Sequence, residues 1–413
     1  MKYVKLGNSD LKVSKVCMGC MGFGNPENGM HTWTLNEEKS REIIKYGIDN
    51  GINFFDTAIG YQNGSSEQYL GRCINDYCNR EDVIIATKFL PRSQNDIDNN
   101  ISGQEHIRQM AEKSLDNLGL DYIDLYIYHM WDFNTPILDV LDGLNQLVDE
   151  GLVKYIGISN CFAWQLAKAN ALARENAFKE FVSVQGHYNL IFREEEREMI
   201  PYCLEDNIAT TPYSSLASGR LSRLADVDSK RLKEDAYAKG KYDKTQKEDS
   251  VIIGRVNEIA KEYDVSMTEV SLAWLESKVT SPIVGATKLH HVDGAVDSVD
   301  LNLSKDDMKY LEELYVPHEL VGVMADNKKS LNDNSKVWVK HTKDRIWSYP
   351  LTIWKFNWIN HDSMIILFFN SSHLFEIGYL IHFLLGLLFL IFSKSSVKNQ
   401  LITSCIILEM SYV

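Results

Sequence analysis

The stretch Phe54–Gly64, FFDTAIGYQNG, decides the fold because it places a carboxylate directly after an apolar run and a tyrosine five residues later. The apolar run is typical of a buried strand, and Asp56 stands where that strand would end. Barrel enzymes place their reacting groups at the carboxyl ends of parallel strands, where the loops converge. The stretch therefore predicts that Asp56 and Tyr61 lie at the mouth of a barrel.

Short β-branched or aliphatic runs recur along the chain, and helical periodicity follows them. The runs are SKVCMG (14–19), INFFD (52–56), VIIATK (83–88), IDLYIYH (123–129), VKYIGIS (153–159), FVSVQ (181–185), IATTPY (208–213) and SPIVGA (281–286). Helices are expected over 37–50, 103–118, 136–150, 162–175, 194–205 and 250–263. Strands that alternate with helices indicate an α/β fold with a parallel, helix-covered sheet.

Eight such units fit a closed (β/α)8 TIM barrel, although a doubly wound open sheet alternates in the same way. The segment GCMGFG (19–24) lacks the G-x-G-x-x-G spacing of a nucleotide-binding open sheet, which favours the barrel. Ahead of the first unit, YVKLGNSDLKVSK (3–15) alternates around an Asn-Ser-Asp turn and predicts a β-hairpin at the barrel bottom. The barrel domain is expected to span 1–324.

The composition limits the classes of binding partner that the protein can have. The 413 residues carry a net charge of −14, which argues against nucleic acid, because its binders need a basic face. No P-loop or H-E-x-x-H motif appears, and no metal site is predicted. The seven scattered cysteines and the absence of an apolar run near the start predict a cytoplasmic protein. Cys17 and Cys20 fit C-x-x-C, but their apolar strand favours packing over redox chemistry.

Polar or aromatic groups follow nearly every predicted strand. They are Asp56 with Tyr61 in its loop, Lys88, His129, Ser159, Asn160, Gln185, Tyr213 and the stretch 285–288. A tyrosine with a pKa of about 10 is a weak acid at neutral pH unless a cation stabilises its anion. Lys88 is expected to supply that cation and Asp56 to keep it charged. His129 would orient a substrate oxygen, so the set resembles a device that protonates a forming alkoxide.

Each of these groups also has a purely structural explanation. Asp56 and Lys88 could form a rim ion pair, Tyr61 could anchor its loop, and His129 could be a satisfied core histidine. The functional interpretation is preferred because four such groups follow consecutive strands.

The motifs around these residues resemble the aldo-keto reductase superfamily, and most closely its aryl-alcohol-dehydrogenase-like branch. They are FFDTAIGYQNGSSEQYLG (54–71), VIIATKF (83–89), DLYIYHMWDFNTP (124–136) and GLVKYIGISNCFAWQ (151–165). The resemblance covers about 3–324. It implies a (β/α)8 barrel that reduces aldehydes or ketones to alcohols with a nicotinamide cofactor, usually NADPH, with NAD as the alternative.

Residue by residue, the resemblance implies a catalytic tetrad of Asp56, Tyr61, Lys88 and His129. It further implies that the nicotinamide end of the cofactor is contacted by Asp56, by Gly19, Cys20 and Met21 beneath the ring, by Ser159, Asn160 and Gln185 at the carboxamide, and by Tyr213 on the ring face. The family also implies that TPYSSLASGRL (211–221) and VGATKLHH (284–291) hold the phosphates and adenosine. The contacts expected there are Ser214, Leu216, Gly219, Leu221, Gly285, Thr287, Lys288 and His291.

Four features bear on cofactor and substrate specificity. Lys288 offers a charge for a 2′-phosphate, or is simply a solvated lysine. Positions that commonly carry glutamine, glutamate and asparagine read His291, Gly294 and Ala295 here, so NADP and NAD both remain open. Trp131 is expected to line a pocket for apolar or aromatic carbonyl substrates, or else to cap the rim. The loop 214–249 is either a lid over the cofactor or a surface loop.

The C-terminal stretch 325–413 differs in character. Its segment LFEIGYLIHFLLGLLFLIF (374–392) is close to the length that a membrane-spanning helix needs. It is interpreted as a membrane anchor, an accidental extension with AT-rich coding bias, or an interaction helix. An alternative function follows from the anchor: a cofactor-sensing binding subunit of a membrane protein with little turnover. The oligomeric state stays open.

Overall fold

The computed structural model describes residues 1–29, 31–224, 235–325 and 327. The predicted extension 325–413, including the apolar segment 374–392, lies outside the described residues except for Ala325 and Asn327. Within the described ranges, no helix is both long and apolar enough to cross a membrane.

Eight parallel strands form one curled sheet, which confirms the predicted barrel. The strands are β3 (Cys17–Gly19), β4 (Phe54–Asp56), β5 (Ile84–Phe89), β6 (Ile123–Tyr128), β7 (Val153–Ser159), β8 (Phe181–Gln185), β9 (Ala209–Thr210) and β10 (Ile283–Gly285). The sheet order is β10-β3-β4-β5-β6-β7-β8-β9. Backbone hydrogen bonds from Thr280 to Thr210 (3.1 Å) and from Ile283 to Pro212 (2.9 Å) then join the two outer strands and close the barrel.

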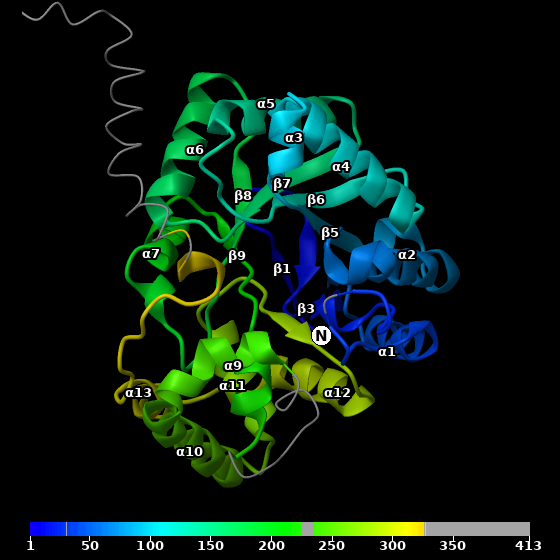
Figure 1. The fold of residues 1–413 in the computed structure, drawn as a ribbon. Helices are drawn as coiled ribbons and strands as arrows, with labels where there is room; N and C mark the ends of the chain where they lie inside the picture. Colours follow the sequence, from blue (N-terminus) through cyan, green and yellow to red (C-terminus); the bar gives the residue numbers. More distant parts are fainter. Residues whose placement is uncertain (30, 225–234, 326, 328–413) are drawn as a thin grey trace, which may run out of the picture. The chain divides into compact units, whose positions relative to one another are not determined.

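Helices surround the strands (Figure 1). They are α1 (Glu37–Asp49), α2 (Ser65–Tyr77), α3 (Gln94–Asp98), α4 (Gly103–Leu118), α5 (Ile137–Asp149), α6 (Ala163–Glu175), α7 (Met199–Glu205), α9 (Ala236–Tyr242), α10 (Gln246–Tyr263), α11 (Met267–Glu276), α12 (Leu289–Asp297) and α13 (Lys305–Glu312). Local sequence sets several boundaries: α4, for example, starts at the N-cap Ser102, which accepts a hydrogen bond from Glu105, and ends at Gly119 with φ 62°.

One predicted helix is wrong in part. The sequence predicts a continuous helix over 194–205, but the structure has a short 3-10 turn at Glu194–Glu196 followed by α7. Glu198 separates the two with φ −139°, outside the helical region. The periodicity of the segment does not reveal this break.

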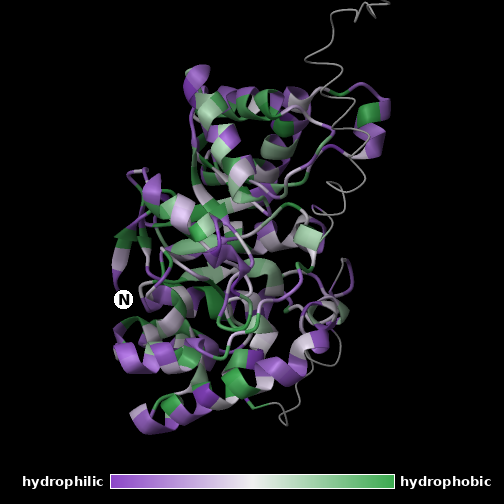
Figure 2. Ribbon diagram, turned by 90° about the vertical axis from the view of Figure 1, so that its left-hand side faces the viewer, coloured by the Kyte–Doolittle hydropathy of each residue, from purple (hydrophilic) through white to green (hydrophobic). Residues whose placement is uncertain are grey.

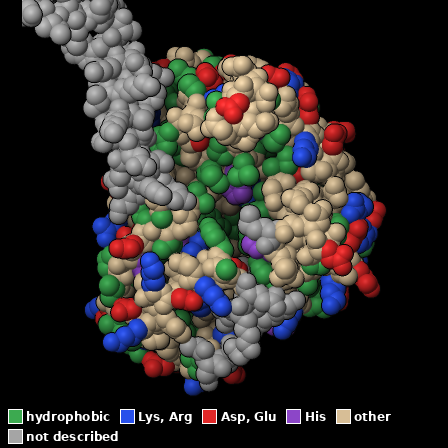
Figure 3. Space-filling view, in the orientation of Figure 1, with side chains coloured by type: hydrophobic (Ala, Val, Ile, Leu, Met, Phe, Trp, Pro, Cys, Tyr) green, Lys and Arg blue, Asp and Glu red, His purple; other side chains and the backbone are tan. Residues whose placement is uncertain are grey.

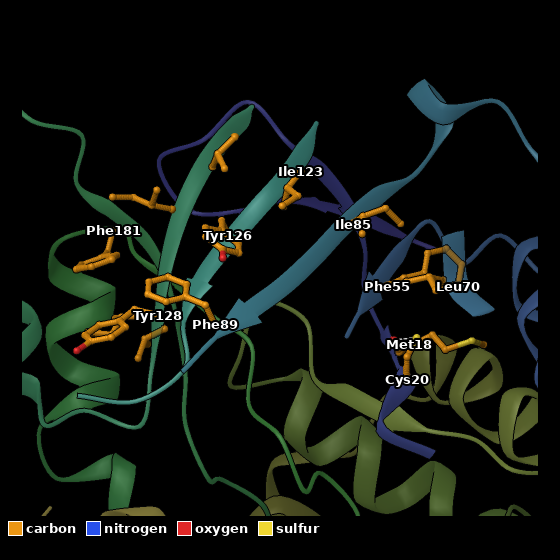
Figure 4. Close-up of a cluster of buried hydrophobic side chains, with 14 of the residues drawn as sticks. Met18, Cys20, Phe55, Leu70, Ile85, Phe89, Ile123, Tyr126, Tyr128 and Phe181 are labelled. Carbon is orange, nitrogen blue, oxygen red and sulfur yellow. Dashed lines mark hydrogen bonds between the residues drawn. The ribbon is translucent and has the colours of Figure 1, made fainter. Parts of the chain in front are cut away.

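The strands carry two kinds of apolar face. Outward side chains such as Phe55, Ile85 and Tyr126 pack against the helices in the main core, which Figure 4 shows in part. Figure 2 shows the corresponding pattern, with hydrophobic strands inside and mixed helices outside. Burial of these faces is the main favourable contribution to folding.

Inward side chains form a separate apolar cluster with the N-terminal hairpin. The hairpin consists of β1 (Tyr3–Lys5) and β2 (Lys12–Ser14), which pair antiparallel. The cluster contains Leu6, Leu11, Val13, Cys17, Phe54, Ile84, Ala86, Leu125, Ile127, Val182, Ala209 and Ile283. The predicted plug at the barrel bottom is thus confirmed. Cys17 is part of this packing, and burial raises the pKa of its thiol well above the usual value.

Candidate active site

Lys88 lies at the centre of the strand exits. It faces the barrel interior from β5, and its side chain is 0% exposed. Its Nζ donates hydrogen bonds to Asp56 Oδ1 (2.6 Å), the Thr57 carbonyl oxygen (2.6 Å) and Tyr61 Oη (3.2 Å). The ammonium group therefore lies between a carboxylate and a phenol, and each of its three hydrogens has an acceptor.

Burial and charge oppose each other at these three groups. Burial lowers the pKa of Lys88, but the attraction of Asp56 and Tyr61 outweighs it and raises that pKa above its usual value. Burial raises the pKa of Asp56, and the Lys88 charge and the hydrogen bonds oppose the rise. Burial also raises the pKa of Tyr61, whereas the Lys88 charge lowers it. Lys88 is thus the group that favours a Tyr61 phenolate.

His129 follows β6 and lies beside the phenol. Its ring meets the Tyr61 ring edge-on, with centroids 6.0 Å apart. Burial lowers the pKa of His129 to about 3, and the Lys88 charge adds to the effect. Its Nδ1 is buried without a hydrogen-bond partner among the described residues. The imidazole is therefore neutral at physiological pH and keeps one N–H, which can donate a hydrogen bond to a substrate oxygen.

Asn160 connects the ends of three strands. Its backbone has φ 52°, a left-handed conformation that asparagine tolerates better than most residues. Its Nδ2 donates to Ser159 Oγ and to the His129 carbonyl oxygen, both at 2.9 Å. Its Oδ1 accepts from Tyr213 Oη at 2.9 Å. The side chain thus holds the histidine strand and the Tyr213 ring at a fixed separation.

Gln185, at the end of β8, joins this network to the carboxylate. Its Nε2 donates to Asp56 Oδ2 at 2.9 Å, and its carbonyl oxygen accepts from Ser159 Oγ at 2.8 Å. The residues that the sequence predicts at the exits of six different strands therefore form one continuous hydrogen-bonded group.

The Tyr213 ring is supported from behind by a stack of rings. The His187 ring lies nearly parallel to it, with an angle of 13° and centroids 5.5 Å apart, and stacks on Phe192 at 4.0 Å. Burial lowers the pKa of His187 well below its usual value, so the imidazole stacks as a neutral ring. From α9, Tyr242 Oη lies 2.7 Å from His187 Nε2, and Lys241 Nζ lies 4.6 Å from the Tyr213 ring centre.

The segments 211–221 and 284–291 form a second group of predicted residues. Ser215 Oγ donates at 2.7 Å to the carbonyl oxygen of Ile283, the residue directly before the second segment, and so holds the two segments together. Left-handed φ values occur at Ser214 (57°), Ala217 (48°), Ser218 (57°) and Gly219 (92°). Turns of this kind can direct backbone N–H groups to an anion, and here the N–H groups of Ala217 and Gly219 already donate to the carbonyl oxygens of Ser214 and Leu216, both at 2.8 Å.

The remaining predicted residues differ in exposure. Leu216 is half-buried, but Leu221 is fully buried in an apolar cluster, with its carbonyl oxygen bonded to Ser271. Gly285 is exposed at the end of β10, and Lys288 is exposed at the start of α12, where the Thr287 N–H donates to His291 Nδ1 at 3.2 Å. On β3, a Cβ on Gly19 would lie 2.7 Å from Ile283, and Cys20 is buried while Met21 is half-buried.

These features fit a nicotinamide dinucleotide. Gln185 Nε2 keeps one hydrogen beyond its bond to Asp56, and the side-chain oxygens of Asn160, Gln185 and Ser159 keep lone pairs, so the group offers a carboxamide both a donor and acceptors. Tyr213 presents an aromatic ring beside them. The left-handed turn 214–219 suits a pyrophosphate, and the exposed start of α12 suits a further anionic group. The described residues hold no group of three or more His, Cys, Asp or Glu side chains that could bind a metal ion.

Apolar side chains surround the mouth above the polar residues. Trp131 is half-buried, and its ring centre lies 6.2 Å from that of Trp164, which is 43% exposed. Leu90 is 41% exposed, and it lies 3.8 Å from a Cβ built on Gly60, next to Tyr61. Figure 3 shows a hollow on this face in which hydrophobic side chains surround histidine.

The model of the aldo/keto reductase family matches residues 15–316. The chain belongs to the aldo/keto reductase family. Versiconal hemiacetal acetate reductase of Aspergillus parasiticus is 37% identical over 338 residues, covering 77% of this chain and 98% of that protein. A candidate aryl-alcohol dehydrogenase of Schizosaccharomyces pombe is 37% identical over 346 residues, with 78% and 97% covered. The predicted family resemblance is thus confirmed.

A solved structure agrees with this aldo/keto reductase assignment. A thermostable aldo-keto reductase in complex with the inhibitor epalrestat matches with a TM-score of 0.61 and 25% identity, covering 76% of this chain and all of that one. The protein is therefore an oxidoreductase of a family that reduces carbonyl compounds and uses nicotinamide cofactors.

Several residues of this aldo/keto reductase site are not apparent from the sequence. They are the Thr57 carbonyl, Gln62, Trp164 and His187. The carbonyl carries no side-chain signal, and Trp164 and His187 lie two to four residues beyond the strand exits on which the prediction depends. Only Gln62, adjacent to Tyr61, had a positional signal.

Proposed function

We propose that the protein uses NADPH to reduce aldehydes or ketones to alcohols and that Tyr61 is the proton donor. The observation that carries this proposal is the position of Lys88 Nζ, 2.6 Å from Asp56 Oδ1 and 3.2 Å from Tyr61 Oη. A buried ammonium held by a carboxylate stabilises the phenolate that remains when the tyrosine gives up its proton.

The chain's own groups then act on one oxygen atom. A reduced nicotinamide, when bound, supplies the hydride that the carbonyl carbon accepts. As the carbon–oxygen π electrons move to the oxygen, Tyr61 donates its hydroxyl proton to that oxygen. The neutral His129 donates a hydrogen bond to the same oxygen, and Lys88 stabilises the phenolate. Asp56 keeps Lys88 charged throughout.

The cofactor contacts are proposed from the two residue groups. Ser159, Asn160 and Gln185 would hold the carboxamide, Tyr213 would stack on the ring, and Gly19 to Met21 would lie beneath it. The turn 214–219 would take the pyrophosphate. NADPH is preferred over NADH because Lys288 is exposed at the start of α12, where its charge can pair with a 2′-phosphate.

The substrate is proposed to carry an apolar or aromatic group. Leu90, Trp131 and Trp164 offer it an apolar wall at the mouth, and such surfaces favour apolar ligands. The relatives named above act on a hemiacetal acetate or carry an aryl-alcohol name, which is compatible with this size and character.

The test is the variant Tyr61→Phe in the full chain. NADPH oxidation with an aromatic aldehyde is expected to fall by about 100- to 10,000-fold, the usual contribution of a general acid. NADPH binding, followed by fluorescence titration, should stay near the wild-type value. Tyr310→Phe is the control, because it removes a phenol hydroxyl from the exposed helix α13. A wild-type rate in Tyr61→Phe would exclude the proton-donor role, and equal rates with NADH would exclude the cofactor preference.

A further inference from the structure

Gln62 follows Tyr61 directly and is buried, with only 1% of its surface exposed. Its amide group makes four hydrogen bonds to the loop after β3. Oε1 accepts from the His31 N–H (2.9 Å). The two hydrogens of Nε2 are shared among three acceptors, the Asn25 carbonyl oxygen (2.8 Å), the His31 carbonyl oxygen (3.0 Å) and Thr34 Oγ1 (3.2 Å). One side chain therefore connects the tyrosine turn to the loop residues 25–29 and 31–34.

The backbone at this turn is held in an unfavourable conformation. Gln62, Asn63 and Gly64 have φ values of 47°, 52° and 89°, so three successive residues are left-handed. A Cβ makes this conformation unfavourable, and glutamine has no local side-chain hydrogen bond that relieves the strain. The four hydrogen bonds are the interaction that offsets this cost.

The loop is shaped around the glutamine side chain. A Cβ on Gly24 would lie 2.6 Å from Gln62 Cβ, and one on Gly29 would lie 2.5 Å from Gln62 Oε1. Both glycines also have positive φ values, 138° and 156°. The close approach of the loop to Gln62 thus requires glycine at both positions.

The far end of the same loop reaches the predicted cofactor site. A Cβ on Gly22 would lie 3.6 Å from Trp33 and 3.6 Å from Thr287, so these two side chains flank the residue that follows Met21. The Leu35 N–H donates to the Gly22 carbonyl oxygen at 2.8 Å. The loop therefore spans from the β3 exit to the turn that carries Tyr61.

We propose that Gln62 is a positioning residue: its amide ties this loop to the Tyr61 turn and thereby holds the tyrosine hydroxyl at its distance from Lys88. The proposal rests on the proposed function, because it concerns the placement of the proton donor. Gln62 does not touch the reacting atoms. A displacement of a reacting group by about 1 Å can cost about 100-fold in rate, so the tie matters for turnover.

The test uses three substitutions that remove different parts of the interaction. Gln62→Leu keeps much of the volume and removes all four hydrogen bonds. Gln62→Glu keeps the acceptor for the His31 N–H and loses the donated bonds as a carboxylate. Gln62→Gly relieves the strain of the left-handed backbone conformation and also removes the side-chain hydrogen bonds. Asn63→Ala is the matched control, because Asn63 is exposed, equally left-handed and bonds the loop only once, to Asn28 (2.8 Å).

For Gln62→Leu and Gln62→Gly, we expect kcat to fall by about 10- to 100-fold with little change in NADPH affinity. The solvent deuterium isotope effect on kcat should rise, because proton transfer from a displaced tyrosine becomes more rate-limiting. Gln62→Glu should fall between wild type and Gln62→Leu, and Asn63→Ala should stay within about twofold of wild type.

Three results would overturn the proposal. A wild-type kcat in Gln62→Gly would mean that only the backbone conformation matters. A fall in kcat that matches a fall in the fraction able to bind NADPH, with an unchanged isotope effect, would mean that Gln62 only stabilises the fold. A wild-type kcat in Gln62→Leu would remove the role altogether. Because Tyr61→Phe tests the proton donor separately, failure of the proposed function is distinguishable from failure of the Gln62 tie.

Discussion

The barrel interior has two layers of side chains. On each strand, inward-facing residues two positions apart contribute one side chain to the lower layer and one to the upper layer. On β4 the lower layer carries Phe54 and the upper layer Asp56. On β5 the pair is Ala86 and Lys88, and along β6 it is Ile127 followed by His129 just after the strand. The lower layer joins the hairpin in an apolar cluster, whereas the upper layer is a polar network of short hydrogen bonds.

The difference shows how one scaffold serves two purposes. Side chains of a strand alternate between faces, so residues two apart point into the same interior at different depths. The lower layer stabilises the fold by burying apolar surface. The upper layer desolvates an ion pair, which contributes little net stability and is often replaceable by apolar residues. Its polarity is therefore best explained by chemistry at the mouth.

The largest effect is expected from Lys88→Met. The substitution leaves the Asp56 carboxylate buried without its partner, which typically destabilises a protein by about 3–5 kcal/mol. Activity should also disappear, because no cation remains to stabilise the Tyr61 phenolate. Chemical denaturation and NADPH oxidation measure the two effects.

A second substitution separates stability from activity. In Asp56→Asn/Lys88→Met the buried charge is gone, so most of the lost stability should return while the activity does not. If the double variant stayed as unstable as Lys88→Met, the upper layer would contribute to the fold as strongly as the lower one, and the contrast between the layers would fail.

The lower layer should show the opposite behaviour. Ile127→Ala removes a buried side chain two residues before His129, and such a cavity costs about 2–5 kcal/mol. The kcat per folded molecule should remain near wild type, provided that the polar layer above keeps its hydrogen bonds. Active-site titration with NADPH gives the folded fraction. A kcat that falls with full NADPH occupancy would show that the two layers are mechanically coupled.

The sequence predicts much of this arrangement, because the end of a strand can be recognised where an apolar run is followed by a charged residue. Asp56 and Lys88 are recognisable in this way, and the structure brings them within 2.6 Å. The alternation of strands and helices likewise predicts the barrel, and the hairpin follows from its turn residues. These features depend on local periodicity, which a single sequence records.

What the sequence does not predict depends on contacts between distant segments. The sequence marks Gln62 only as a polar residue, and its role depends on the loop after β3, which packs around it in the structure. The role of His187 likewise depends on its stacking against Tyr213. Leu221 was expected beside the cofactor, but its side chain points into an apolar cluster. Motif position alone does not show which way a side chain points.

The polar layer should also make stability depend on pH. The pKa of His129 is lowered from 6.5 to about 3 in the folded protein. Below about pH 6.5 the unfolded chain takes up a proton at His129 that the folded protein does not bind, so the unfolding free energy falls as the pH drops from 6.5 toward 3. His129→Gln cannot titrate, so its unfolding free energy should fall less steeply with acid than that of wild type. Parallel slopes in denaturation curves from neutral to acidic pH would mean that His129 is solvated in the folded state.

The smallest effect is expected above both layers, at the rim. Trp164→Ala removes an exposed ring beside Trp131, and loss of such an apolar contact is worth about 1–2 kcal/mol in substrate binding. KM for a large aromatic aldehyde should therefore rise by about tenfold, whereas KM for a small aliphatic aldehyde, kcat and stability should barely change. Tyr3→Ala is the matched control, since Tyr3 is a similarly exposed aromatic residue on the hairpin at the opposite end of the barrel. Equal changes in KM for both aldehydes would mean that Trp164 does not contact the aromatic group of the substrate. Substrate selection would then depend on the polar layer and not on Trp164.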